Sequence, residues 1–247
     1  MHLAAVLEDS GDRQRDYDID VNGTRNVLDA CLAAGVAHLT VTSSGAAYGY
    51  HADNPNWIDE QDPLRGNPEF AYSDHKRQVE ELLADYRARY PQLTQLVLRP
   101  GTVLGAETRN LITNLFSKKR ILAIRGSDSP FVFIWDQDLI NIIRTGVLLQ
   151  RTGIYNLAGD GAVPIRRIAA LLGKPVLTVP VTVLRLALRI GKLVGVGRYG
   201  PEKIDFLRYR PVLSNRRLKQ EFGYTPLKTS EQTFAFYIAH ARARGDL

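Results

Sequence analysis

The segment HLTVTSSGAAYG at residues 38–49 decides the expected fold. Its first seven residues are rich in β-branched side chains, which predicts a strand over residues 38–44. Before it, apolar residues recur at helical spacing over residues 18–34, and Gly35 is placed to end that helix as its C-cap. After it, Gly, Asn and Pro predict a loop over residues 45–68. A helix that leads into a buried strand is typical of parallel α/β sheets.

The same alternation continues along the chain. A long helix is expected over residues 69–90, stopped by Pro91, and apolar strands are expected over residues 93–100 and 153–159. The first six residues, MHLAAV, read as another short strand. This rhythm predicts an α/β fold with a doubly wound parallel sheet.

Beyond Gly159 the pattern changes to short helices separated by Gly and Pro. They predict a small, mostly helical C-terminal region that ends with a helix over residues 230–243. Within this region, residues 181–195 form an apolar helix with three basic residues on one face, Arg185, Arg189 and Lys192. That helix could lie on an anionic membrane surface. Alternatively, it packs on its own domain with the basic face toward water or an anionic ligand.

Composition narrows the classes of protein. The chain has 247 residues, 45% hydrophobic and 23% charged, which is enough for one large domain or two small ones with a sizeable core. The single cysteine, Cys31, excludes an internal disulfide and a multi-thiolate metal site, and its apolar helical context predicts a buried, inert thiol. No metal site is expected. A lone thiol suits a reducing cytosol, so a cytoplasmic location is expected.

The net charge of +6 comes from basic residues that are spread out, with no run of four or more. No nucleic-acid motif is present, so nucleic acid is not an expected partner, whereas a phosphorylated ligand would be attracted. The first residues lack a basic region followed by an apolar core, and no stretch of about 18 uncharged apolar residues occurs. Neither a signal peptide nor a spanning helix is therefore expected, and there is no firm membrane signal.

Three residues suggest acid–base chemistry. Ser44 ends a predicted parallel strand, and ligands bind outside the carboxyl ends of such strands. Tyr72 and Lys76 are four residues apart, on one face of the predicted helix. A tyrosine has an ordinary pKa of about 10, and a neighbouring ammonium is expected to lower it. The set could then move a proton on or off a carbinol oxygen. The alternatives are a serine that only caps a turn and a helix face that only meets water.

Five motifs in order resemble the extended short-chain dehydrogenase/reductase superfamily, in its NAD-dependent epimerase/dehydratase branch. They are HLAA at 2–5, DVNGTRNVLDAC at 20–31, VTSSGAAYG at 41–49, YSDHK at 72–76 and LRPGTVLG at 98–105. The resemblance is strong over residues 1–105 and faint beyond residue 175. It departs from the family at Asp20, where members commonly have Asn, and this puts that polar contact in doubt.

The resemblance implies roles for individual residues. Ser44 matches the catalytic hydroxyl and Tyr72 the general acid/base, while Lys76 matches the lysine that holds the nicotinamide ribose and lowers the tyrosine pKa. Asp138, in WDQDL at 135–139, is expected to cap or orient a helix. The residues expected to lie against NAD or NADP, besides Tyr72 and Lys76, are Leu3, Ala4, Ala5, Pro100, Gly101, Thr102 and Val103.

The implied function is an NAD(P)-dependent epimerase or reductase that acts on a nucleotide sugar or another secondary alcohol or carbonyl. A dehydratase ranks lower because Gly45 and Ala46 follow Ser44 where a dehydratase would have Thr-Asp-Glu. The implied architecture is a partial Rossmann domain over 1–103 and 131–158, with a substrate-binding region over 104–130 and 159–247. A homodimer through the 69–90 helix is possible by the same analogy.

The glycine-rich turn that binds the cofactor pyrophosphate in this superfamily does not occur in the 247 residues. By resemblance, about 60–70 residues with the first strands of the sheet would precede Met1. A start codon placed too late is the favoured explanation, ahead of a truncated gene or a second chain. A measured mass of 27.6 kDa for the native protein would contradict the explanation of a late start codon. The alternative function is a cofactor-deficient binding or regulatory protein of the same fold.

Overall fold

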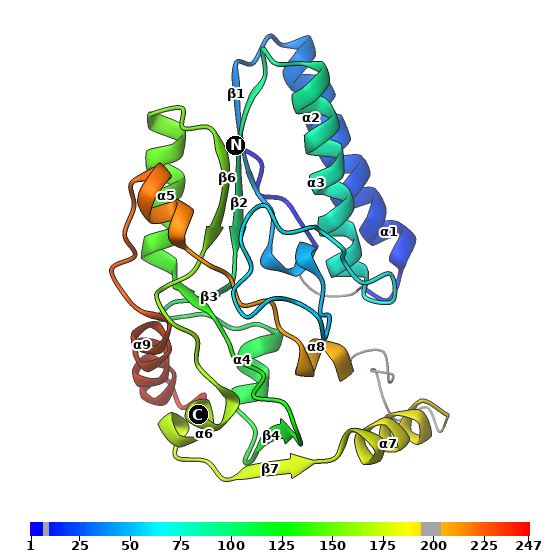
Figure 1. Ribbon diagram of the computed structural model, residues 1–247, viewed down its shortest axis with the longest axis vertical. Helices are drawn as coiled ribbons and strands as arrows, with labels where there is room; N and C mark the ends of the chain where they lie inside the picture. The colour runs from blue at the N-terminus through cyan, green and yellow to red at the C-terminus, as the bar shows by residue number, and fades with distance from the viewer. Residues whose placement is uncertain (7–9, 194–203) are drawn as a thin grey trace.

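The computed structural model describes residues 1–6, 10–193 and 204–247. Its upper part is a parallel sheet in the order β1-β2-β6, formed by His38–Thr42, Thr94–Pro100 and Gly153–Leu157 (Figure 1). Helices α2 (Gly23–Ala33) and α3 (Ala71–Arg89) cover one face, and α5 (Asp136–Leu148) covers the other. The α/β fold with a parallel sheet is therefore confirmed.

Strand β2 shows why these residues form a central strand. Val97 packs with Val41 and Leu83 beneath α2 and α3, whereas Leu96 and Leu98 pack on the opposite face. Because side chains alternate along a strand, burial on both faces requires a continuous apolar run. The sequence of β2 provides that run.

The first six residues do not form the expected strand. Only His2 pairs with the sheet, through an isolated parallel bridge to Val41, with hydrogen bonds from His2 N to Thr40 O (2.8 Å) and from Thr42 N to His2 O (3.3 Å). Val6 N then donates to the Asp20 carboxylate at 2.8 Å. After His2, the backbone of this segment bonds to the buried Asp20 carboxylate and not to a neighbouring strand. The prediction of a strand over residues 1–6 was therefore wrong.

The first helical segment begins earlier than residue 18. Helix α1 (Arg13–Tyr17), a π-helical turn η1 (Asp18–Asn22) and α2 follow one another without a break, and Asp12 caps the start by accepting from Arg15 N at 3.0 Å. The predicted end is confirmed. Gly35 has φ +63°, and Val36 N donates to Cys31 O at 2.8 Å, which is the Schellman arrangement. Cys31 itself is half-buried, not buried as expected.

The other predicted elements are found close to their expected bounds. Helix α3 lies inside residues 69–90, and α9 (Ser230–Ala243) matches its prediction. Thr229 and Gln232 form a capping box at the start of α9. The expected loop after β1 opens with a 3-10 turn, η2 (Gly45–Tyr48).

The lower part of the molecule contains two small parallel pairs of strands. β3 (Thr102–Leu104) pairs with β5 (Phe133–Trp135), and β4 (Ile121–Ile124) pairs with β7 (Val176–Val179). Strand β7 lies in the region expected to be mostly helical, and its hydrogen bonds to a strand 55 residues earlier (176 − 121) explain why local patterns did not predict it. The remaining helical elements are α4 (Leu111–Phe116), α6 (Ile165–Leu172), α7 (Val181–Leu193), α8 (Ile204–Arg208) and the π-helical η4 (Leu218–Phe222). None of the helices within the described residues has the length and apolar character needed to cross a membrane.

Asp138 does not cap a helix through its side chain. It lies fully buried in the first turn of α5, where its Oδ1 accepts from Tyr224 Oη at 2.8 Å and from Leu227 N at 3.0 Å. Of the two expected roles, capping was wrong, whereas these bonds orient α5 against the segment that leads from η4 to α9.

Candidate active site

Ser44 and Tyr72 are brought together by the turn that follows β1. The side chain of Ser44 caps η2, accepting from Ala46 N at 3.1 Å. Ser73, in the first turn of α3, donates to Ala46 O at 2.7 Å and so holds α3 against this turn. A hydrogen bond joins Ser44 to Tyr72. The capping alternative for Ser44 is therefore correct, and the same hydroxyl also contacts the tyrosine.

The electrostatics of Tyr72 differ from the expectation. Burial raises its pKa above the ordinary value, the Asp20 charge raises it further, and the hydrogen bond with Ser44 only partly opposes these effects. Lys76 Nζ lies 5.8 Å from the centroid of the Tyr72 ring, but its charge does not reverse the direction. The expected lowering of the Tyr72 pKa by Lys76 is thus not found, and the phenol is neutral at neutral pH.

Lys76 is 4% exposed, and among the described residues it makes no hydrogen bond or ion pair. Burial lowers its pKa, while the charges of Asp20 and Glu80 oppose that shift. A buried ammonium normally requires hydrogen-bond acceptors. Ribose hydroxyls are such acceptors, so the surroundings of Lys76 fit the nicotinamide-ribose end of a dinucleotide.

Asp20 and His75 form a buried pair that the sequence did not predict. Asp20 Oδ2 and His75 Nδ1 are 3.5 Å apart, and neither atom has a hydrogen-bond partner in the described part of the chain. The edge of the Tyr17 ring covers the His75 ring, with centroids 5.7 Å apart. Asp20 does make a polar contact through its other oxygen, since Oδ1 accepts from Val6 N at 2.8 Å. His75 lies within the YSDHK motif, but spacing alone could not pair it with Asp20.

Arg99 joins four elements behind the site. Its guanidinium binds both carboxylate oxygens of Glu80, at 2.7 and 2.9 Å, and donates to Tyr48 Oη at 2.7 Å. Tyr48 in turn donates to Asn156 Oδ1 at 2.9 Å. All four side chains are buried, and burial raises the pKa of Tyr48 to about 12. This network fixes α3, and with it the helix turn that carries Lys76, against β2, β6 and η2.

The residues predicted to lie against the cofactor are found at the same edge of the sheet as Ser44. Residues 3–5 follow His2 beyond its bridge to Val41, and Leu3 is 48% exposed. The backbone of Gly101 donates to Leu157 O at 2.9 Å, and a Cβ there would lie 2.9 Å from Val132 Cγ2. Pro100 ends β2, and Thr102 and Val103 begin β3, with the backbone in extended conformation.

An aromatic cluster continues from Tyr72 toward α8. Phe70 lies 6.3 Å from Tyr72, 5.6 Å from Tyr50 and 5.5 Å from Phe206, measured between ring centroids. The guanidinium of Arg210 lies 4.6 Å from the Phe206 ring, and its Nε has no hydrogen-bond partner in the described residues. Burial lowers the pKa of Arg210 to about 10. No sequence pattern singled out Arg210, because basic residues are common throughout residues 200–226.

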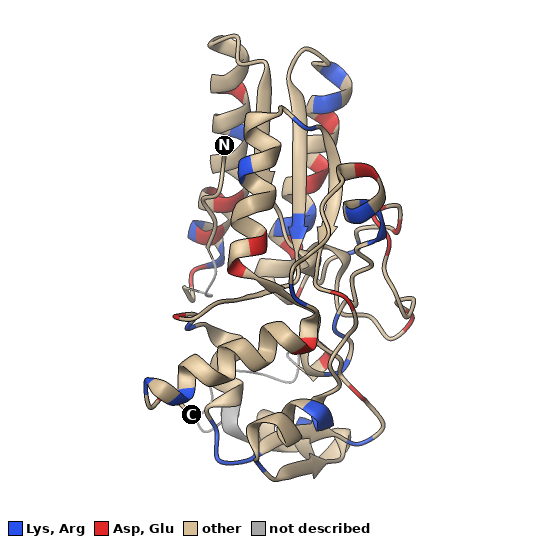
Figure 2. Ribbon diagram, turned by 90° about the vertical axis from the view of Figure 1, so that its left-hand side faces the viewer, with Lys and Arg blue, Asp and Glu red and all other residues tan. Residues whose placement is uncertain are grey.

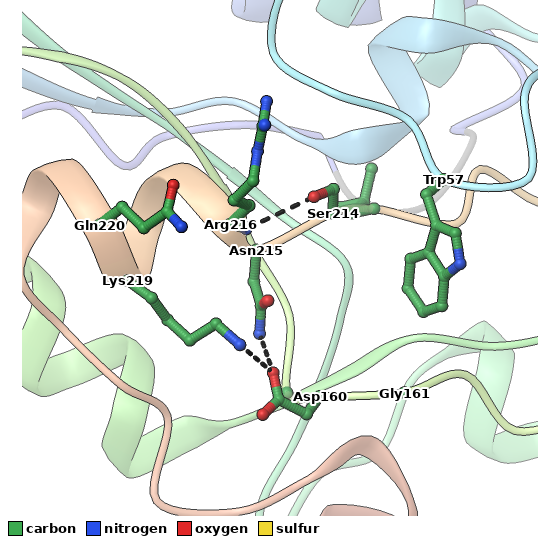
Figure 3. A pocket seen from close by; sticks show the side chains of 10 residues that line it. Trp57, Asp160, Gly161, Ser214, Asn215, Arg216, Lys219 and Gln220 are labelled. Carbon is green, nitrogen blue, oxygen red and sulfur yellow. Dashed lines mark hydrogen bonds and ion pairs between the residues drawn. The ribbon is translucent and has the colours of Figure 1, made fainter.

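Two hollows lie apart from Ser44, Tyr72 and Lys76. The larger, about 380 Å³, is lined by Trp57, Asp160, Asn215 and Lys219 among others (Figure 3). In it, Lys219 Nζ and Asn215 Nδ2 each lie 2.8 Å from Asp160 Oδ1, so the cation is already neutralised. The smaller, about 230 Å³, lies beside Tyr48 and Arg65. Neither is lined by Ser44, Tyr72 or Lys76, and neither has a feature that assigns it a function.

Known proteins with similar sequences share parts of this chain. An Escherichia coli O157:H7 protein, N-acetyl-alpha-D-glucosaminyl-diphospho-ditrans,octacis-undecaprenol 4-epimerase, is 35% identical over 103 residues, which cover 41% of this chain and 30% of the relative. An uncharacterized protein of Mycobacterium tuberculosis is 21% identical over 232 residues, which cover 92% of this chain and 60% of the relative. The chain therefore spans between about a third and three-fifths of the length of these relatives.

Solved structures show the same fold. The structure of MoeE5 in complex with UDP-glucuronic acid and NAD superposes with a TM-score of 0.73 at 21% identity, covering 98% of this chain and 78% of MoeE5. The model of the NAD dependent epimerase/dehydratase family matches residues 1–135, more than half of the chain. This match covers Ser44, Tyr72, Lys76 and the segment that follows β2. The chain belongs to the NAD dependent epimerase/dehydratase family.

Proposed function

We propose that this chain carries the proton-transfer and substrate-binding residues of an NAD-dependent epimerase or reductase whose substrate is a sugar linked to a diphosphate. The observation that carries the proposal is the hydrogen-bonded pair of Ser44 and Tyr72 with the buried, unpaired Lys76 one turn further along α3. The family name supports NAD as the cofactor.

Bound NAD would supply a hydride acceptor at the carbinol carbon of the sugar. Tyr72 would exchange the proton of the reacting oxygen, and Ser44 would hydrogen-bond the same oxygen. Since burial raises the pKa of Tyr72, its neutral phenol is suited to donate a proton when a carbonyl is reduced. Lys76 would hold the ribose hydroxyls. Leu3, Ala4, Ala5 and Pro100 to Val103 would lie along the nicotinamide side of the cofactor.

The substrate class rests on two kinds of support. The E. coli relative acts on a sugar joined through a diphosphate to a lipid, and MoeE5 binds a sugar joined through a diphosphate to uridine. Arg210 is a half-buried guanidinium beside the aromatic cluster at Tyr72, suited to an anionic group next to a sugar ring. The ligand group that Arg210 would bind is the diphosphate that both molecules share.

The catalytic part of the proposal is tested with Tyr72→Phe, using Tyr86→Phe on the same helix as the matched control. We expect Tyr72→Phe to lower kcat by about 10²–10⁴-fold while the Kd for NAD stays unchanged. Tyr86→Phe should keep kcat, since Tyr86 lies near the other end of α3 and its Oη donates to Asp29, away from Ser44 and Tyr72. Normal turnover by Tyr72→Phe would refute the assignment. Failure of the wild type to bind NAD while UDP still binds would favour the cofactor-deficient binding protein.

The substrate part is tested with Arg210→Met and its neighbour Arg208→Met as the control. Binding of UDP, a UDP-sugar and a polyprenyl-diphosphate sugar would be compared by calorimetry. Loss of one charged hydrogen bond should weaken diphosphate binding by about 10–100-fold in Arg210→Met alone. The preferred ligand would separate a nucleotide from a lipid as the carrier of the sugar.

Three coarser expectations accompany this proposal. We propose the division into a dinucleotide-binding part (1–103 and 131–158) and a substrate-binding part (104–130 and 159–247), a cytoplasmic location, and a homodimer formed through α3. Sedimentation velocity would test the dimer, and substitutions on the exposed side of α3 should then shift the monomer–dimer equilibrium.

A further inference from the structure

Helix α7 exposes apolar side chains on its outer face. Val183, Leu186 and Ile190 are 54%, 59% and 50% exposed, and their spacing of three and four residues places them in one row along the helix. The opposite face, with Val181, Leu184 and Leu188, is the partly buried one. The helix thus packs on the protein through one apolar face and presents a second one outward.

The row continues onto the strand before the helix. Leu177, on β7, is 44% exposed and is separated from α7 only by a short connection. Figure 1 shows β7 and α7 along the lower edge of the molecule, with α7 projecting from it. The exposed apolar residues of β7 and α7 therefore follow one another along one edge of the molecule.

The stretch of sequence that includes β7 and α7 carries charge of one sign. Residues 161–201 contain no Asp or Glu, and they contain seven basic residues: Arg166, Arg167, Lys174, Arg185, Arg189, Lys192 and Arg198. Arg185 and Arg189 are exposed on α7 beside the apolar row. In Figure 2 blue predominates over red toward the lower end of the molecule. The sequence left open whether α7 packs on its domain or meets a membrane. Packing on the domain alone does not explain why a second row of apolar side chains on α7 is exposed.

We propose that α7 is a membrane-surface contact, in which Val183, Leu186 and Ile190 enter the interfacial region of an anionic phospholipid layer while Arg185 and Arg189 bind its phosphates. An amphipathic helix with an apolar row and flanking basic residues binds such a surface in the plane of the layer. Long arginine side chains reach the headgroups while their stems lie along apolar surface. A second protein copy is disfavoured as the occupant, because the basic residues beside the row would face those of the other copy. This surface is independent of the proposed catalytic chemistry.

The contact would bring the lipid layer close to the candidate substrate side. Helix α7 contacts α8, and α8 carries Phe206 of the aromatic cluster at Tyr72. A protein docked through α7 would therefore present this cluster near the lipid headgroups.

The test is co-sedimentation of the full chain with phosphatidylcholine vesicles, with and without phosphatidylglycerol. We expect binding to the phosphatidylglycerol vesicles and loss of binding in Leu186→Glu. Leu148→Glu is the matched control, since Leu148 is 71% exposed at the end of α5, and it should bind as the wild type does. Arg185→Gln and Arg189→Gln should each weaken binding about fivefold, and added salt should weaken it in the wild type.

Several results would overturn the proposal. These are absence of wild-type binding, equal binding by Leu186→Glu, equal loss in Leu148→Glu, or binding that does not depend on phosphatidylglycerol. Gel filtration without lipid tests whether a second copy of the chain covers the row instead. If Leu186→Glu dissociates a wild-type oligomer and vesicles do not bind, the row is a contact between copies of the chain. Circular dichroism of each variant confirms that the fold is kept.

Discussion

The ion pair between Glu80 and Arg99 offers a quantitative test of how the site is held. Both side chains are almost completely buried, and the guanidinium binds both carboxylate oxygens at 2.7 and 2.9 Å. Replacing Glu80 by Leu leaves a buried guanidinium without its counter-charge. Removal of one partner of a buried pair costs about 3–5 kcal/mol of unfolding free energy.

That loss corresponds to a large change in melting temperature. In chains of this size, 1 kcal/mol shifts Tm by about 2–4 °C, so Glu80→Leu should melt roughly 6–20 °C lower than the wild type. Urea unfolding should give the same loss with an unchanged m value if the transition stays two-state. Glu81→Leu, one residue along and exposed, is the control and should change the unfolding free energy by less than about 1 kcal/mol.

The double variant Glu80→Leu, Arg99→Met separates the charge effect from packing. It removes both charges and leaves the Tyr48 hydroxyl bonded to Asn156, so the remaining loss is about 2 kcal/mol for the hydrogen bonds of Arg99 to Tyr48 and Glu60. The double variant should therefore be more stable than either single variant. A double variant as unstable as the sum of the two would refute this reasoning, as would a loss below about 1 kcal/mol in Glu80→Leu.

Further predictions concern the surroundings of the site. In Asp20→Asn, loss of the carboxylate should lower the pKa of Tyr72 and that of Lys76, moving the pH profile of kcat/KM to lower pH, and an unmoved profile would contradict the role of Asp20. Burial and the Lys76 charge lower the pKa of His2 below its ordinary 6.5, so the unfolded chain binds more protons there and stability is lost as the pH falls through and below that value. His2→Asn should flatten this loss in unfolding curves measured on either side of that pH, and an equally steep loss would count against it. In Gly49→Ala, with φ +84° and Gly66 O 2.5 Å from the added Cβ, we expect a loss of about 1–3 kcal/mol. Gly126→Ala, with φ +79° and open space, should lose less in the same urea unfolding measurement, and equal losses would show that crowding plays no part.

Local patterns predicted the helices well because their ends depend on nearby residues. Gly35 ends α2 through its own left-handed conformation, and α9 begins at a capping box that spans only Thr229 to Gln232. The segment 1–6 and strand β7 were predicted poorly because their pairing depends on distant partners. For residues 1–6 that partner was the carboxylate of Asp20, and for β7 it was β4.

The catalytic roles of the candidate site residues stay a prediction, and the electrostatics around Tyr72 differ from what the sequence led us to expect. The motifs located Ser44, Tyr72 and Lys76, and the hydrogen bond of Ser44 to Tyr72 agrees with their proposed association. Burial decides the direction of the Tyr72 pKa, and burial depends on the whole fold. For the same reason, the pair of Asp20 with His75 and the position of Arg210 beside Phe206 could not be inferred from spacing.

The cap that Ser44 forms limits how its hydroxyl can meet Tyr72. A serine hydroxyl has one proton and two lone pairs, and in Ser44 one lone pair already accepts from Ala46 N. The proton and the second lone pair remain available to Tyr72, and donation of that proton to the Tyr72 oxygen is the arrangement that lowers the Tyr72 pKa. The turn after β1 therefore places a hydroxyl proton where it can stabilise a phenolate on Tyr72.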